Sequence, residues 1–275
     1  MKRIVRISGL CALVVLALTA CKKDEPQKVV SFTATIASPE TKTHTEGLNN
    51  NYYLVWDDTD KIKVINPAGN DCDFEVTNTT GQNAYFFSDD PGKVDFLTNL
   101  TTTDFTAFYP KAVIRDDGVE LTIPAEQKYQ PLHNFATDSY PMVGWNEVDN
   151  FIFMSNAGFL YLMFKAPENQ LMQIDRIVLT ANEDIAGKMV YSKDGLSYVF
   201  EGESNVITLK SDSKIGVMNE MIRDATFILP EGCLTNGFNV KFYDGETLVG
   251  DFSTSKVNVI VAQQFLEMPC VTLTP

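Results

Sequence analysis

Histidine is scarce in this chain. The 275 residues hold only two histidines, His44 and His133, and neither stands in a motif that would give it a catalytic role. The sequence also lacks the GxSxG, HExxH, P-loop and dinucleotide-binding patterns, which mark nucleophilic, zinc-dependent and nucleotide-dependent enzymes. These absences predict a protein that is not an enzyme and that needs no cofactor and no metal.

Basic residues are also few, with 22 lysines and arginines against 36 aspartates and glutamates. The resulting net charge of −14 repels phosphate groups, so we expect no nucleic-acid partner. A charge of this size favours solubility. The abundance of acids weakens any argument for a glycosidase, because a pair of carboxylates at the required separation would arise by chance.

Cysteine occurs five times, with no CxxC pair. Cys72, Cys233 and Cys270 are widely spaced and odd in number, which fits neither a zinc site nor a disulfide framework. The pattern favours buried thiols, and a bond between Cys233 and Cys270 remains an open alternative.

Long apolar runs are confined to the beginning of the chain. The run from Leu10 to Leu18 follows Lys2, Arg3 and Arg6. It is shorter than the roughly 20 apolar residues that span a bilayer as a helix. A basic start followed by a short apolar run is typical of an export signal, which we place at residues 1–20.

The signal ends in Leu18-Thr19-Ala20-Cys21, which resembles the lipobox of bacterial lipoproteins. The resemblance implies cleavage before Cys21 and lipidation of Cys21, so that residues 21–28 form a lipidated tether in the outer membrane. Two or more acyl chains hold a protein stably to a membrane, whereas one does not. The following Lys22-Lys23-Asp24-Glu25 resembles the short tag that sends Bacteroidetes lipoproteins to the cell surface.

The rest of the chain has the pattern of an all-β protein. Three Asp-Gly pairs, at Asp117, Asp194 and Asp244, are flanked by alternating apolar residues, and each predicts a hairpin with a type I′ turn. The continuous apolar run from Phe159 to Phe164 predicts a central strand covered on both faces. Only the segment from Lys214 to Arg223 suggests a short helix.

The first strand organises the fold that we expect. Val30, Phe32, Ala34 and Ile36 alternate with Ser and Thr, as in a half-buried strand. Burying each large side chain contributes about 1.5–3 kcal/mol, and a domain is stable by only about 5–15 kcal/mol. Losing this strand would nearly unfold its domain unless another strand replaced it.

A polar loop follows the first strand, from Ser38 to about Asn51, and contains Lys42. Exposed loops are the preferred sites of proteolysis, so Lys42 is a candidate processing site. Further on, the polar, turn-rich segment from Asp138 to Asn150 predicts a domain boundary. We therefore expect an N-terminal β-sandwich domain at residues 29–147 and a C-terminal one at residues 148–275.

An aspartate-rich run and the two tryptophans can each be interpreted either as a binding site or as a structural feature. The run Asp57-Asp58-Thr59-Asp60 could bind calcium, but it lacks the full EF-hand spacing, which favours a turn whose carboxylates cap backbone amides. Trp56 and Trp145 could serve as platforms for sugars, but core positions are commoner for tryptophan.

Taken in order, several segments resemble the Bacteroidetes fimbrillin family. Besides the lipobox and the first strand, the resemblance rests on the following segments: Thr41-Lys42-Thr43, Trp56 to Val64, Phe108-Tyr109-Pro110, Ile123 to Gln127, Asp138 to Val143, and Phe159 to Phe164. Each segment is weak alone, but their order and spacing make the set fairly specific over most of the chain after the signal.

The resemblance implies two tandem transthyretin-like β-sandwich domains and a lipoprotein precursor that joins or anchors a surface fimbria (a type V pilus). In that family a trypsin-like protease cuts after the first strand, and the C-terminal strand of a neighbouring subunit fills the groove. Here Val30, Phe32, Ala34 and Ile36 would be the groove-filling residues. The chain departs from an Arg-specific cut, since Lys42 is the only basic residue between the first strand and Lys61.

The leading hypothesis is therefore a structural subunit of a cell-surface fimbria, or its lipid-retained anchor or tip, assembled by β-strand addition and serving adhesion. Its expected partners are other fimbrial subunits, the outer membrane through the lipid, and host or bacterial surface ligands. The alternative is a surface-exposed glycan-binding lipoprotein with a β-sandwich fold. A hydrolase on a β-sandwich is the third hypothesis.

Overall fold

The computed structural model describes residues 30–37, 56–66, 68–88, 105–130, 137–147 and 150–274. The predicted signal peptide and tether lie outside these residues, as do Cys21, Lys42, His44 and His133. No described helix is long and apolar enough to cross a bilayer.

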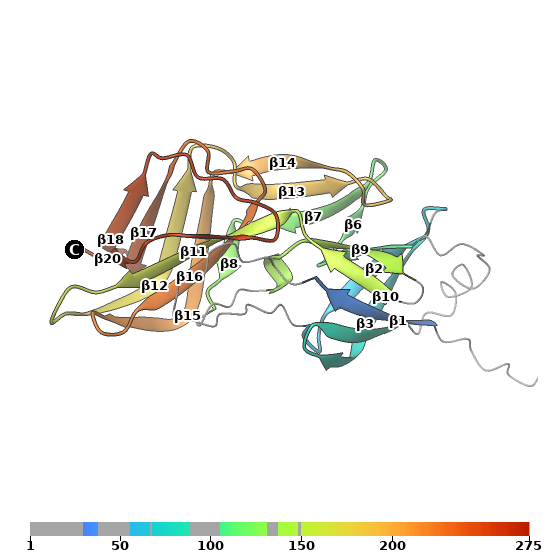
Figure 1. The fold of residues 1–275 in the computed structure, drawn as a ribbon, viewed down its shortest axis with the longest axis horizontal. Helices are drawn as coiled ribbons and strands as arrows, with labels where there is room; N and C mark the ends of the chain where they lie inside the picture. Colours follow the sequence, from blue (N-terminus) through green and yellow to red (C-terminus); the bar gives the residue numbers. More distant parts are fainter. Residues whose placement is uncertain are drawn as a thin grey trace, which may run out of the picture.

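The described residues form twenty strands and one short 3-10 helix, η1 (Thr137–Ser139), with no α-helix among them. The prediction of an all-β protein is therefore confirmed. Figure 1 shows two groups of strands side by side, with the N-terminal strands on the right and the C-terminal strands on the left.

The N-terminal group is a closed barrel of seven strands. Around the barrel their order is β1 (Val30–Ile36), β10 (Asn150–Met154), β9 (Met142–Glu147), β5 (Thr106–Tyr109), β2 (Lys61–Ile65), β3 (Asp71–Thr80) and β4 (Asn83–Ser88). Aromatic side chains fill its interior. Trp56 meets Phe86, Tyr109 and Phe153 edge to face at centroid distances of 5.0–5.3 Å, an arrangement that aromatic pairs prefer.

The C-terminal group contains two sheets. One sheet holds β16 (Arg223–Pro230), β11 (Ala157–Lys165), β19 (Phe265–Glu267) and β20 (Val271–Thr272). The other holds β18 (Thr247–Thr254), β17 (Phe238–Asp244), β12 (Leu171–Ala181), β15 (Val206–Met218) and β8 (Glu126–Lys128). Phe164 from the first and Phe242 from the second meet at 5.0 Å between ring centroids, so the sheets share one core.

A third sheet connects the two groups. Its strands are β14 (Tyr198–Ser204), β13 (Ala186–Tyr191), β7 (Val119–Ile123) and β6 (Val113–Ile114). Here β7, which precedes residue 147, pairs with β13, while β10, which follows it, closes the barrel. Strand pairing therefore crosses the expected boundary in both directions, and the division at residues 147 and 148 stays a prediction.

Most strands lie where the alternation predicted them, and β11 is buried on both faces as its apolar run indicates. The prediction of a short helix from Lys214 to Arg223 is wrong. Strand β15 continues to Met218 and β16 begins at Arg223. Ile215 and Val217 are buried while their neighbours are exposed or half-buried, which is the period of a strand.

All three Asp-Gly pairs lie where two paired strands meet, as predicted. The prediction that they form type I′ turns is wrong. Gly195 and Gly245 have positive φ values of 72° and 58°, whereas the aspartates before them are not among the residues with positive φ. A type I′ turn needs positive φ at both central residues. Gly118 has no positive φ either.

Candidate functional site around the first strand

Strand β1 lies between two strands that are far from it in sequence. It pairs antiparallel with β4, from Val30 opposite Ser88 to Thr35 opposite Asn83. On its other side it pairs parallel with β10, from Thr33 opposite Asn150 to Ile36 opposite Phe153. In Figure 1 the blue strand β1 runs beside β10 at the right of the molecule. Removing β1 would therefore open the barrel and expose two strand edges.

The inner face of β1 fills the barrel core. Phe32, Ala34 and Ile36 are 6%, 0% and 3% exposed. The ring of Phe32 lies 5.3 Å from that of Phe74 and 5.0 Å from that of Phe151. The strand therefore supplies side chains that the rest of the barrel surrounds, as the alternation of apolar residues indicated.

The outer face of β1 is held by hydrogen bonds between side chains. The Thr33 hydroxyl donates to Asn150 Oδ1 at 2.8 Å, and the Thr35 hydroxyl donates to Asn83 Oδ1 at 2.8 Å. Asn83 lies on β4 and Asn150 on β10. Both neighbouring strands thus fix the register of β1.

The last strands of the chain repeat this parallel relationship. Strand β11 follows β10 after a two-residue break, at which Ser155 donates to the carbonyl of Pro141 at 2.5 Å. Both β19 and β20 run parallel to β11, as β1 runs parallel to β10. The first and last strands therefore flank successive parts of one stretch, residues 150–165.

The residues predicted to fill a groove fall on β1, although the structure describes only the backbone of Val30. Trp56 is a core residue, as expected, and is 4% exposed. Trp145 differs, because it is half-buried at the surface and its indole N–H donates to the carbonyl of Asp194 at 3.0 Å. Cys72 and Cys233 are buried, whereas Cys270 is exposed, so burial is confirmed for only two of the three cysteines.

The aspartate run forms the turn that its sequence favoured. The Asp60 carboxylate accepts hydrogen bonds from the Asp57 amide at 2.7 Å and the Tyr109 hydroxyl at 2.8 Å. Asp57 Oδ1 accepts from the Thr59 amide at 3.2 Å. Burial raises the pKa of Asp60 above its ordinary value, although these hydrogen bonds oppose the shift.

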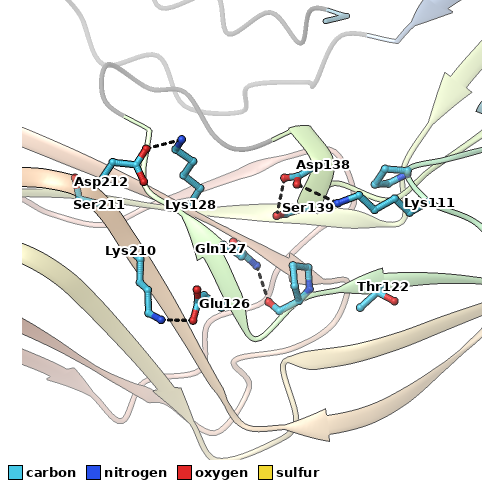
Figure 2. A pocket seen from close by; sticks show the side chains of 12 residues that line it. Lys111, Thr122, Glu126, Gln127, Lys128, Asp138, Ser139, Lys210, Ser211 and Asp212 are labelled. Atoms are coloured by element: carbon cyan, nitrogen blue, oxygen red, sulfur yellow. Dashed lines mark hydrogen bonds and ion pairs between the residues drawn. The ribbon is translucent and has the colours of Figure 1, made fainter. Parts of the chain in front are cut away.

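A cleft of about 620 Å³ lies beside β8 and is lined by paired charges (Figure 2). Lys128 pairs with Asp212 at 2.6 Å, Lys111 with Asp138 at 3.4 Å, and Lys210 pairs with Glu126. Each of these carboxylates already has a cationic partner. No cluster of three or more metal-ligating side chains occurs in the described part of the chain.

Gln127, at the edge of this cleft, is a structural residue that the sequence did not identify. It is 2% exposed. Its amide nitrogen donates to the Ile228 carbonyl at 2.9 Å, and its oxygen accepts from the Ile228 amide at 3.0 Å. These bonds tie β8 to β16. In the sequence, the segment Ile123 to Gln127 contributes only to the family resemblance.

No family model and no curated protein matches the sequence. Solved structures do match in fold. One from Bacteroides ovatus has a TM-score of 0.54 at 14% identity and covers 91% of this chain and 96% of its own. Another, from Bacteroides uniformis, has a TM-score of 0.53 at 14% identity and covers 90% and 94%. Both are provisionally named cell adhesion proteins. At this identity the likeness shows a shared fold.

Proposed function

We propose that this chain is a structural subunit of a cell-surface fimbria, or its lipid-retained anchor or tip, which assembles by β-strand addition and serves adhesion. Under this proposal it is a fimbrillin-like, non-enzymatic protein with two tandem transthyretin-like domains. Cys21 carries the lipid that holds it in the outer membrane, facing outward. The similar folds provisionally named for cell adhesion support this proposal.

The observation that carries the proposal is the position of β1. This strand of seven residues pairs on both sides with strands distant in sequence and places Phe32, Ala34 and Ile36 in the core. In strand addition, main-chain hydrogen bonds give affinity and alternate side chains give specificity. A barrel that has lost β1 would offer an incoming strand both unpaired main-chain groups and an apolar slot for its alternate side chains.

The end of the chain suits the role of donor. Thr272 and Thr274 alternate with Val271 and Leu273, as Thr33 and Thr35 alternate with the apolar residues of β1. Leu273 is fully buried and its amide donates to the Lys165 carbonyl at 2.9 Å. For a second copy to donate this strand to the slot beside β10, β20 would first have to leave its own place beside β11.

Cutting at Lys42 and following the size of the product tests this proposal. Residues 22–275 are treated briefly with trypsin, and mass and oligomeric state are measured together. We expect cleavage after Lys42, followed either by retention of the bound strand or by oligomerisation. A Lys42→Gln variant is the matched control and should remain uncut in this loop and monomeric.

A synthetic peptide of residues 29–37 should suppress the oligomers, and the same peptide with Phe32→Asp should not, because a charge does not fit an apolar slot. Rapid loss of residues 22–42 that leaves a stable, soluble monomer would contradict strand addition, since the slot would then need no strand.

A further inference from the structure

The tip of the hairpin between β13 and β14 is docked against the outside of the barrel. The carbonyl of Asp194, at this tip, accepts hydrogen bonds from Trp145 Nε1 at 3.0 Å and from the Thr106 hydroxyl at 3.3 Å. Thr106 lies opposite Trp145 on the neighbouring strands β5 and β9. The tip and the barrel are therefore fixed to each other at one point.

The tip is also rigid within itself. The Asp194 carboxylate accepts from the Ser192 hydroxyl at 2.6 Å and from the Leu196 amide at 3.0 Å. These bonds hold the pKa of Asp194 below its ordinary value, and the bond from Ser192 has the larger effect. The ordered turn presents Leu196 with 77% of its surface exposed.

A cleft of about 600 Å³ opens between this tip and the rim of the barrel. Its volume lies within the range of about 300–1,000 Å³ that is usual for small-molecule sites. Trp145, Phe105 and Leu196 give it apolar walls, while Asn66 and Ser192 add neutral polar groups.

Charge is sparse in this cleft, in contrast to the one beside β8. Among the described residues that line it, only Lys193 and Asp194 are charged, and the Asp194 carboxylate is engaged by the hairpin itself. The protein as a whole carries a net charge of −14, which disfavours an anionic ligand. Amide and hydroxyl side chains beside aromatic rings suit a neutral ligand that has both hydroxyl groups and apolar faces.

We propose that this cleft binds a short neutral oligosaccharide, with one sugar ring packed on Trp145 and Leu196 and its hydroxyls paired with the side-chain amides of Asn66 and Asn146, both of which line the cleft. This site is separate from β1, so it requires neither cleavage nor exchange of that strand. The hydrogen bond from Trp145 to Asp194 fixes the indole before the ligand arrives, which lowers the entropic cost of binding.

Calorimetry on the full-length chain tests the inference. The protein is purified in a detergent without a sugar headgroup and titrated with maltotriose, cellotriose, lacto-N-triose and triacetylchitotriose, and with sialyllactose as the anionic comparison. We expect saturable binding of at least one neutral sugar with a Kd between about 10 μM and 1 mM. Fluorescence should change with it, since Trp145 borders the cleft and the second tryptophan, Trp56, is buried elsewhere.

Two variants place the binding in the cleft. Leu196→Asp should weaken the affinity at least tenfold, because it puts a charge on an apolar wall. Val199→Asp is the matched control, since Val199 is 65% exposed on the same hairpin but does not line the cleft, and it should leave the affinity unchanged. Absence of binding by every neutral sugar, binding of sialyllactose alone, or equal affinities in the two variants would each overturn the inference.

Discussion

The indole nitrogen of Trp145 donates a hydrogen bond to the carbonyl of Asp194 at 3.0 Å, and this bond joins the barrel to the sheet beside it. The next residue, Gly195, sets how closely the two can approach. It has a φ of 72°, and a Cβ placed on it would lie 2.6 Å from Val143 Cγ1 and 3.0 Å from Thr106 Cγ2. The contact therefore depends on a residue without a side chain.

Gly195→Ala should lower the free energy of unfolding by about 2–4 kcal/mol, because it combines a positive φ with steric overlap. Gly245→Ala is the matched control. Gly245 has a φ of 58°, but a Cβ placed on it would meet no atom within 4 Å. Only the backbone cost of about 1–2 kcal/mol therefore applies to the control. Urea unfolding of both variants checks the difference, and equal losses would show that the close contact is unimportant.

Phe32→Asp should destabilise the protein by at least about 3 kcal/mol, since it removes a buried ring and places an unpaired charge in the barrel core. Ser31→Asp, the control, introduces the same charged side chain at the neighbouring position, which is exposed. It should change the free energy of unfolding by less than about 0.5 kcal/mol. Thermal unfolding of the two variants separates burial from strand propensity. Similar melting temperatures would contradict the described register of β1.

Gln127→Glu should cost about 2–5 kcal/mol at pH 7, because a buried carboxylate would face the Ile228 carbonyl without a donor. When protonated, the introduced carboxyl can donate as the amide does. Its folded-state pKa is therefore raised, and the loss should shrink as the pH falls toward the unfolded value of about 4.3. Gln173→Glu, at an exposed position, is the control. Denaturation between pH 4 and 7 measures both, and a loss in Gln127→Glu that is independent of pH would contradict the assignment.

Asp60 should make the protein less stable as the pH rises. Its pKa is raised in the folded state by burial, so the folded protein binds the proton more tightly than the unfolded chain. Its contribution is fully present below about pH 3.9, the unfolded value, and is lost as the pH rises through the folded pKa. Asp60→Asn should flatten this part of the stability profile, whereas Asp58→Asn, at an exposed position, should not. Parallel profiles for wild type and Asp60→Asn would refute the prediction.

Cys21→Ala should abolish lipidation and release the protein from the outer membrane, if the lipobox is used. Metabolic labelling with palmitate and membrane fractionation measure both effects. Cys11→Ala, within the apolar part of the signal, is the control and should leave both unchanged. A Cys21→Ala protein that still carries palmitate would show that the lipoprotein prediction is wrong.

The sequence predicted strands best where apolar residues alternate. Strands β1, β7 and β17 follow this pattern, because each has one face toward a core. Strand β9 was missed. Its sequence, MVGWNE, lies in a segment interpreted as polar and turn-rich, yet Met142 and Val143 are each 1% exposed. Its neighbours β5 and β10 supply the burial, and a pattern within one segment does not show such distant partners.

The candidate sites, like the strands, could be predicted from the sequence only in part. The inner residues of β1 could be predicted from alternation, but its two neighbours could not, since parallel pairing with β10 joins residues more than a hundred positions apart. The cleft at Trp145 also escaped prediction. Its walls come from β5, β9 and the hairpin tip, and only the folded chain brings these together. Trp56 and Trp145 were both expected in the core, because residue type alone does not reveal their different exposure.

The parallel pairing of β1 with β10 also has a mechanical consequence. If the chain is held at its N-terminal end and pulled from its C-terminal half, β1 and the stretch of residues 150–165 are drawn in opposite directions along their common axis. The hydrogen bonds between the two strands are then loaded in shear and share the force at the same time, instead of breaking one after another. The same stretch carries the tension onward to β19 and β20, so one continuous segment links the first described strand to the last described strand.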